Sequence, residues 1–229
     1  MSSIPVITLD GPSGTGKGTL SQRLAQHLHW HFLDSGALYR VLALAATQHT
    51  IHLTDEPALA HLAQHLPVKF VVNQRGAHPL IFLDNQDVTH AIRTEKCGND
   101  ASTLSALPAV RQALIDRQRA FRQAPGLVTD GRDMGTVIFP DATLKLFLDA
   151  SPEERARRRH KQLQDKGVLT DLTTIQTELQ QRDDRDRQRA IAPLKPAADA
   201  LIIDTTHLNI DEVFKQILQT LPKFLTQNR

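Results

Sequence analysis

Short apolar runs alternate with longer stretches of helical periodicity along most of this chain. Five of the runs are rich in β-branched or large apolar side chains and are bounded by turn-forming residues, as buried strands are. They fall at residues 6–9, 32–33, 126–129, 144–148 and 201–204. Strands that alternate with helices in this way predict an α/β fold, a five-stranded parallel sheet with helices on both faces.

The helical periodicity is clearest directly after Lys17. Leu20, Leu24 and Leu28 recur at a spacing of four and therefore share one helix face, which would pack back on the first strand. Similar spacings predict further helices at residues 38–46, 59–66, 94–104, 110–122 and 211–221.

The period of the pattern changes to two after Pro67. Residues 68–72, 80–83 and 86–88 have the composition of short strands, and turn-forming residues at 73–79 and 84–85 separate them. We interpret this part as a small antiparallel insertion.

The most charged segment runs from Pro152 to Pro196. Two stripes of charged side chains at helical spacing consist of Arg155, Arg158 and Arg159, and of Arg182, Arg185, Asp186 and Arg189. We interpret the segment as a mobile, helical, arginine-rich lid. Arg157, Lys161 and Arg187 instead fit a solvated, salt-bridged surface.

A glycine-rich turn joins the first strand to the first helix. In LDGPSGTGKGT, Gly11, Gly16 and Lys17 match the GxxxxGK frame of a phosphate-binding loop. Inward-pointing backbone N–H groups and the positive end of the helix dipole together bind a polyphosphate. The residues expected around a triphosphate are Gly11, Pro12, Ser13, Gly14, Thr15, Gly16, Lys17, Gly18 and Thr19.

The residue after the lysine departs from the usual loop. Ser or Thr normally stands there and binds Mg²⁺, whereas here Gly18 intervenes and the hydroxyl belongs to Thr19. This GKGT ending resembles that of nucleoside monophosphate kinases, which implies that nucleotide phosphates and water hold the Mg²⁺. We therefore assign no side chain as a metal ligand.

Polar side chains follow two of the predicted strands. Asp34, Ser35 and Gly36 follow the second, and the sequence Asp130-Gly131-Arg132-Asp133 follows the strand at 126–129. Ligands of open α/β sheets bind beyond the carboxyl ends of the strands, so these are candidate binding residues. Surface ion pairs are the alternative interpretation of the second group.

Composition narrows the class of protein. The 229 residues suit a single α/β domain with insertions, and the net charge of +2 argues against nucleic acid as a partner. The single cysteine, Cys97, excludes an intramolecular disulfide, and no run of 18 apolar residues is present. Histidines 27, 29 and 31 do not have metal-ligand spacing. We expect a soluble, cytoplasmic monomer that binds neither nucleic acid nor a membrane.

The motifs GPSGTGKGT, DSGALYR, DGRDMGTVIFPDA, DASPEERARRR and RDDRDR together resemble those of the bacterial cytidylate kinases. The resemblance covers essentially the whole chain. It implies a P-loop kinase domain with a core (1–66, 105–151, 191–229), an NMP-binding insertion (67–104) and a lid region (152–190). It also implies transfer of a phosphoryl group from ATP, with Mg²⁺, to CMP or dCMP in pyrimidine nucleotide metabolism.

The resemblance further implies a role for individual residues. It places the phosphate of CMP near Arg40 and Arg132, the ribose near Tyr39, Arg182 and Asp186, and the cytosine near Ser102, Arg111 and Asp133. The full acceptor set is Ser35, Tyr39, Arg40, Ser102, Arg111, Asp130, Arg132, Asp133, Arg182, Asp186 and Arg189. The residues expected to act in catalysis are Lys17, Arg132, Arg158, Arg182 and Arg189.

The chemistry of phosphate-to-phosphate transfer is consistent with this composition. A phosphate monoester is mostly a dianion at pH 7 and needs no general base, but two anionic groups must be neutralised, for which arginine is suited. A kinase for UMP or AMP remains an alternative. A GTPase-class switch would show N-K-x-D and D-x-x-G motifs, which the chain lacks. A hydroxyl kinase with Asp34 or Asp133 as base would not explain so many arginines.

Overall fold

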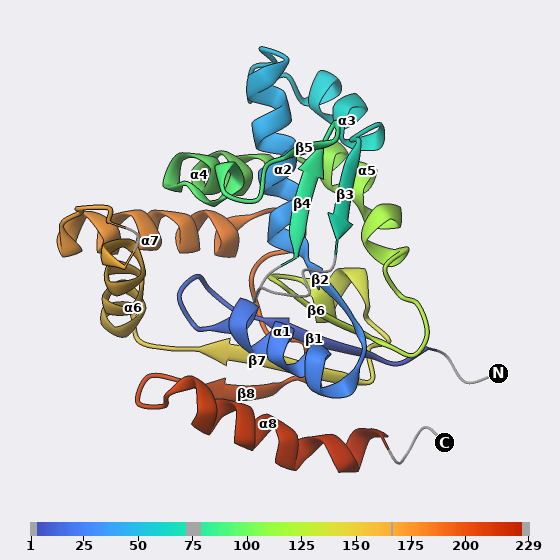
Figure 1. Ribbon diagram of the computed structural model, residues 1–229, viewed down its shortest axis with the longest axis vertical. Helices are drawn as coiled ribbons and strands as arrows, with labels where there is room; N and C mark the ends of the chain where they lie inside the picture. The colour runs from blue at the N-terminus through green and yellow to red at the C-terminus, as the bar shows by residue number, and fades with distance from the viewer. Residues whose placement is uncertain (1–3, 72–78, 166, 226–229) are drawn as a thin grey trace. The chain divides into compact units, whose positions relative to one another are not determined.

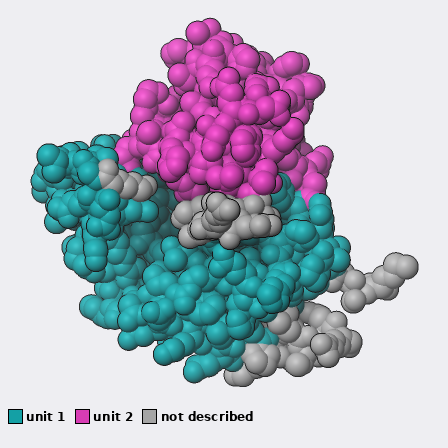
Figure 2. All heavy atoms as spheres, viewed as in Figure 1, with its two compact units in different colours: residues 1–33, 121–229 teal, residues 34–120 magenta. Residues whose placement is uncertain are grey.

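The computed structural model describes residues 4–71, 79–165 and 167–225. It consists of two compact units, one formed by residues 1–33 and 121–229 and the other by residues 34–120 (Figure 2). We call them unit 1 and unit 2 and describe each by itself.

The main sheet has five strands in the order β2-β6-β1-β7-β8 (Figure 1). They are β1 (Val6–Asp10), β2 (His31–Asp34), β6 (Leu127–Gly131), β7 (Leu144–Asp149) and β8 (Leu201–Asp204). β1 runs parallel to both of its neighbours, with Asp10 opposite Gly131 on β6 and Phe147 on β7. The end of β1, where the phosphate-binding loop begins, thus lies in the middle of the sheet.

Two helices of unit 1 pack on the apolar side chains of this sheet. They are α1 (Lys17–Leu28) and α8 (Ile210–Leu225), which also contact each other. Leu20 and Leu24 of α1 are completely buried in one cluster with Ile7 and Leu9 of β1 and Val213 of α8. The spacing of four seen in the sequence therefore marks the face of α1 that meets the sheet.

The charged segment of unit 1 forms two helices, α6 (Pro152–Gln164) and α7 (Leu172–Gln188). Ser151 and Asp171 cap them, because their side chains accept hydrogen bonds from Glu154 N (3.2 Å) and Thr174 N (3.0 Å). A small cluster consisting of Ala156, Leu163, Ile175 and Leu179 holds the pair together.

Unit 2 contains a second sheet and most of the remaining helices. The sheet is antiparallel, with β3 (Val68–Val71), β4 (Leu80–Leu83) and β5 (Gln86–Asp87) in that order. β4 and β5 join through Asp84 and Asn85, which both have the positive φ of a tight hairpin turn. The helices are α2 (Ser35–Gln48), α3 (Glu56–Gln64), η1 (Ala91–Arg93), α4 (Glu95–Leu104) and α5 (Pro108–Arg119).

The α/β fold, the five-stranded parallel sheet and the small antiparallel insertion predicted from the sequence are confirmed. Several boundaries differ from the prediction. Asp130 and Gly131 belong to β6 rather than following it, and the helix predicted at 110–122 is α5, Pro108–Arg119. Val72 and the predicted turn up to residue 78 lie outside the described residues. No helix in the described part of the chain is long and apolar enough to cross a membrane.

Candidate active site

The phosphate-binding loop leaves β1 at Gly11 in a conformation that only glycine tolerates. Gly11 has φ +143°, and a Cβ there would lie 2.0 Å from the carbonyl oxygen of Leu148 on β7. Thr15 closes the loop on itself, since its hydroxyl donates to Pro12 O at 3.2 Å. The loop then enters α1 at Gly16, whose φ is +90°.

Lys17 is buried at the start of α1, and its ammonium group points into the loop. Its Nζ donates to Pro12 O at 2.6 Å. Burial is the main cause that lowers the pKa of Lys17 to about 7; the positive charges of Arg132 and Arg182 act in the same direction, and Asp130 and Asp10 oppose them. A buried lysine whose charge is disfavoured by neighbouring cations lies in a site prepared for an anion.

Arg132 follows β6 and connects the phosphate-binding loop to α7. Its Nη2 donates to Ser13 Oγ and its Nε to Asp186 Oδ2, both at 2.7 Å. Burial alone would lower the pKa of Arg132, but the Asp186 carboxylate more than compensates and raises it. Arg132 is thus a permanently charged group held between the loop and the charged helix.

Asp186 is the centre of the arginine cluster on α7. Burial would raise its pKa, but Arg132, Arg189 and Arg182 outweigh that effect and lower it. Arg189 also donates from Nε to the backbone oxygen of Asp186 at 3.2 Å. The structure therefore brings together four residues expected at the acceptor, one from the β6 end and three from the second arginine stripe.

The turn after β6 contains Asp133, which is 4% exposed. It leads into η2 (Met134–Ile138), a single π-helical turn in which Val137 N donates to Asp133 O at 2.9 Å. The side chain of Asp10 receives hydrogen bonds from the first two amides of η2. Burial raises the pKa of Asp10 to about 6, although these amides oppose the shift.

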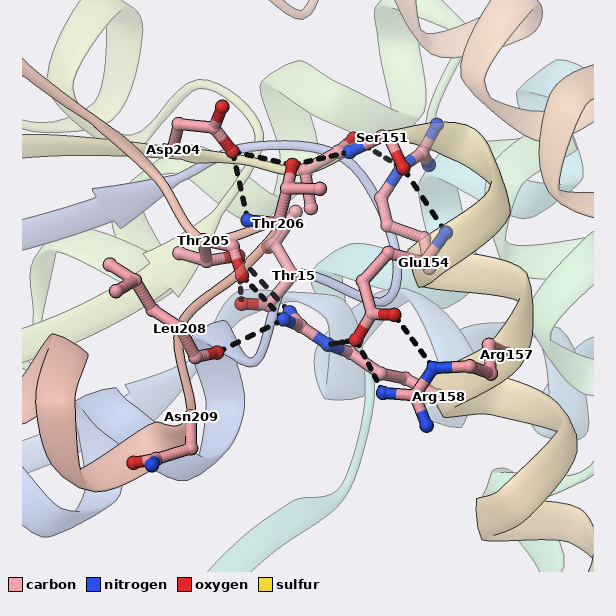
Figure 3. A network of polar contacts seen from close by, with 12 residues as sticks. Thr15, Ser151, Glu154, Arg157, Arg158, Asp204, Thr205, Thr206, Leu208 and Asn209 are labelled. Atoms are coloured by element: carbon pink, nitrogen blue, oxygen red, sulfur yellow. Dashed lines mark hydrogen bonds and ion pairs between the residues drawn. The ribbon is translucent and has the colours of Figure 1, made fainter.

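Figure 3 shows a second polar network, around Arg158 of α6. Arg158 Nε donates to Glu154 Oε1 at 2.8 Å, Nη1 to Thr205 Oγ1 at 3.1 Å, and Nη2 to Leu208 O at 3.2 Å and to Thr205 O. The guanidinium therefore lies on the segment after β8. That Arg158 acts on the transferred phosphoryl group remains a prediction. To do so, its guanidinium would have to give up these hydrogen bonds and bind phosphate oxygens instead.

The other residues of the first stripe do not behave as one group. Arg155 is 2% exposed and forms an ion pair with Asp183, which is completely buried. Arg159 instead donates to Gln162 on its own helix. Arg155 is thus buried in the α6–α7 contact rather than exposed on a lid surface, and the mobility of the lid stays a prediction. Arg157, Lys161 and Arg187 are exposed, as the solvated-surface interpretation expected.

The family model described as cytidylate kinase matches residues 7–223. The chain belongs to the cytidylate kinase family. A curated cytidylate kinase of Nitrosococcus oceani is 60% identical over 95% of this chain and 96% of its own length. One from Aeromonas hydrophila subsp. hydrophila is 59% identical over 93% and 92%, respectively. A gluconokinase structure from Sinorhizobium meliloti 1021 aligns over 97% and 94% of the two chains at 14% identity and a TM-score of 0.49, which is too low to bear on function.

The remaining acceptor residues expected from the cytidylate kinase family lie in unit 2. Ser35 Oγ donates to Gln118 Oε1 at 2.7 Å, and Arg40 donates from Nη1 to Ile92 O at 2.8 Å and Thr94 O at 3.1 Å. A chain of bonds joins Arg111 to Ser102. Arg111 Nη1 donates to Ser105 O (3.1 Å), and Ser105 Oγ donates to Ser102 O (2.9 Å).

Several contacts among the described residues were not predicted from the sequence. Arg155 donates to Ser13 O at 3.2 Å, and its Cβ lies 2.9 Å from where a Cβ on Gly14 would be. Gly98 lies against the Arg40 guanidinium, and a Cβ there would come within 2.7 Å of Nη2. Gln118 is buried beneath Ser35. Only for Arg155 was there a signal, its place in an arginine stripe.

The side-chain oxygens near the loop could supply only a minority of the ligands of a Mg²⁺ ion. Mg²⁺ prefers carboxylate and phosphate oxygens and keeps several waters. Both oxygens of Asp10 already accept amide hydrogens, and Thr19 is exposed. Among the residues described, no three His, Cys, Asp or Glu side chains are grouped as a metal site. A nucleotide would therefore have to supply most of the metal's ligands.

Proposed function

We propose that the protein transfers the γ-phosphoryl group of ATP to CMP or dCMP, giving ADP and CDP or dCDP. The observation that carries the proposal is the convergence of Lys17, Arg132 and Arg182 at the phosphate-binding loop. The positive charges of Arg132 and Arg182 lower the pKa of Lys17, and Arg132 donates a hydrogen bond to Ser13 of the loop. Asp186 pairs with part of this positive charge, and the phosphate groups of two nucleotides would neutralise the rest. Membership of the cytidylate kinase family names the nucleotides.

The proposed mechanism relies on positioning and charge neutralisation. The loop amides and Lys17 hold the triphosphate, while Arg132 and Arg40 hold the acceptor phosphate. That phosphate is a dianion and attacks without a general base. Arg158, Arg182 and Arg189 stabilise the charge on the transferring group. Bound with the nucleotide, Mg²⁺ would supply further neutralisation of the phosphate oxygens.

Recognition of the nucleoside is proposed from the same family pattern. Tyr39, Arg182 and Asp186 contact the ribose, and Ser102, Arg111 and Asp133 contact the cytosine, with Ser35 and Asp130 nearby. A carboxylate accepts a hydrogen bond from the amine of cytosine but repels the carbonyl of uracil. The same proposal includes a soluble, cytoplasmic, monomeric enzyme of pyrimidine nucleotide metabolism.

The test is release of ADP from ATP in the presence of CMP, dCMP, UMP, AMP or shikimate. We expect CMP and dCMP to be used best. Preference for UMP or AMP would identify a related monophosphate kinase, and preference for shikimate a hydroxyl kinase. ATP binding without turnover on any acceptor would indicate a nucleotide switch.

Two variants examine the proposed roles in the same assay. Lys17→Met should lower kcat by several orders of magnitude, and Arg132→Ala should raise KM for CMP far more than KM for ATP. Lys161→Met and Arg187→Ala are the matched controls, since both side chains are exposed on the charged helices. Retention of activity within about tenfold in Lys17→Met would reject the role of Lys17.

A further inference from the structure

Asp10 is a buried carboxylate that the proposed reaction does not use. It is the last residue of β1, stands directly before Gly11, and is 5% exposed. Its Oδ1 accepts a hydrogen bond from Met134 N at 2.9 Å, and its Oδ2 accepts one from Gly135 N at 2.8 Å. Both carboxylate oxygens are thus bound to consecutive amides of one turn.

These two amides come directly after Arg132 and Asp133, which are proposed to hold the acceptor's phosphate and base. The position of the Asp10 carboxylate therefore fixes where the two side chains leave the backbone. The turn has little freedom to move closer, because a Cβ on Gly135 would lie 2.8 Å from Thr8 Oγ1 of β1. The turn thus packs on β1 and is hydrogen-bonded to the side chain of Asp10, the last residue of that strand.

A second contact joins the same turn to the phosphate-binding loop. Arg132 Nη2 donates to Ser13 Oγ at 2.7 Å, three residues beyond Asp10. The loop proposed for the donor and the turn proposed for the acceptor are consequently connected both at the base, by Asp10, and at the tip, by Ser13. A shift of the turn would change the distance between the two phosphate groups.

We propose that Asp10 is a positioning residue that sets the acceptor-binding turn at residues 132–135 in register with the phosphate-binding loop. This inference rests on the proposed function. It explains why a carboxylate is present in a place where a charge is costly to bury. Only a carboxylate presents two acceptor oxygens to two neighbouring N–H groups, and charge-assisted bonds of this type are stronger than neutral ones.

The substitution Asp10→Asn tests the proposal with almost no change in volume. The asparagine amide can accept from one of the two amides, but its NH₂ group faces the other N–H, so one end of the turn is released. A displacement of about 1 Å typically costs on the order of a hundredfold in rate. We therefore expect kcat/KM for CMP to fall about a hundredfold while the calorimetric Kd for ATP stays within about twofold.

Asp55→Asn is the matched control. Asp55 caps α3 and accepts from Ala58 N at 3.1 Å, so the same chemical change also removes a charge and weakens a backbone contact there. Thermal unfolding of all variants is recorded, and kinetics are measured well below the lowest Tm. We expect Asp55→Asn to lower Tm only slightly, because asparagine caps a helix nearly as well as aspartate, and to leave KM for CMP unchanged.

The possible results separate the inference from the proposed function. If the wild-type enzyme does not phosphorylate CMP, the proposed function fails first. If the wild-type enzyme is active and Asp10→Asn changes only Tm, or weakens ATP and CMP equally, the positioning role is overturned. Asp10→Ser, which is smaller and neutral, replaces the asparagine variant if that one does not fold. Failure of both to fold would make Asp10 a purely structural residue and would also overturn the proposal.

Discussion

Lys17 is expected to change its charge when a nucleotide binds. With a pKa of about 7, it is mostly neutral at pH 8, whereas a bound triphosphate favours the ammonium form. Binding of ATP at pH 8 should therefore be accompanied by proton uptake at Lys17, and this uptake should be smaller at pH 6, where Lys17 is mostly charged already.

Calorimetry in buffers of different ionisation enthalpy measures this uptake. Lys17→Arg provides the control, because arginine keeps its charge at every pH of the experiment. A binding heat at pH 8 that does not depend on the buffer would contradict the depressed pKa.

Asp133 is the residue on which the distinction between cytosine and uracil is proposed to depend. Asp133→Asn keeps the shape of the side chain but allows it to donate as well as accept. Since a mispaired buried polar group costs ~1–3 kcal/mol, we expect the CMP to UMP ratio of kcat/KM to narrow by roughly tenfold or more. If the ratio holds while both activities fall together, the base is recognised elsewhere.

For individual residues, the sequence predicted the phosphate-binding loop better than it predicted the contacts that its residues make. The GxxxxGK frame has one structural solution, so Lys17 could be located from its spacing alone. The bond from Arg132 to Ser13 joins residues 119 positions apart, and no local pattern reports such a pair. Gly98 and Gln118 escaped notice because single small or polar residues inside helices have no distinctive spacing.

Among the elements, α6 and α7 depend on a buried ion pair at their contact. Removing one partner of such a pair leaves an uncompensated charge and costs ~3–5 kcal/mol, whereas replacing both by apolar side chains is often nearly neutral. Arg155→Met and Asp183→Leu should each destabilise the protein strongly, and the double variant should recover most of the loss.

Urea unfolding of the two single variants and the double variant measures this coupling. Strictly additive losses would show that the pair contributes nothing as a pair. The free energies should be compared at equal m values, so that a change in the unfolded state is not mistaken for a change in the contact.

Helical spacing identified both arginine stripes, but it could not predict which residues their side chains contact. Arg155 and Arg158 lie three residues apart and so share a helix face, yet one is buried against Asp183 and the other lies on the segment after β8. Periodicity fixes the direction of a side chain relative to its own helix. The neighbours depend on tertiary packing, which the pattern does not contain.

For the whole molecule, the prediction is a monomer. Large apolar side chains that are exposed in the described ranges are few and fall in four segments of the sequence: Val71; Val168, Leu169 and Leu172; Ile191; and Leu201 and Ile202. Stable homodimers usually bury one continuous apolar area. For a monomer, sedimentation equilibrium should give a mass near 25.5 kDa at all concentrations, and a concentration-dependent dimer mass would contradict the prediction.

The alternation of strands and helices predicted the parallel sheet, but not the order β2-β6-β1-β7-β8. β1 and β6 are buried along their whole length, and a buried parallel strand has no solvent-exposed polar face that would distinguish one neighbour from another. The division into core, insertion and lid stays a prediction. The second compact unit spans residues 34–120, which is a longer stretch than the predicted insertion at 67–104.

The central place of β1 has a consequence for how the protein is made. Its neighbours, β6 and β7, begin at Leu127 and Leu144. After β1 has been synthesised, more than a hundred further residues must therefore be added before β1 can pair with either neighbour. At roughly 5–20 residues per second, that delay is on the order of ten seconds. During translation, the nascent chain therefore carries an unpaired, largely apolar strand, and the start of the phosphate-binding loop is not held in a sheet until β6 and β7 have been made.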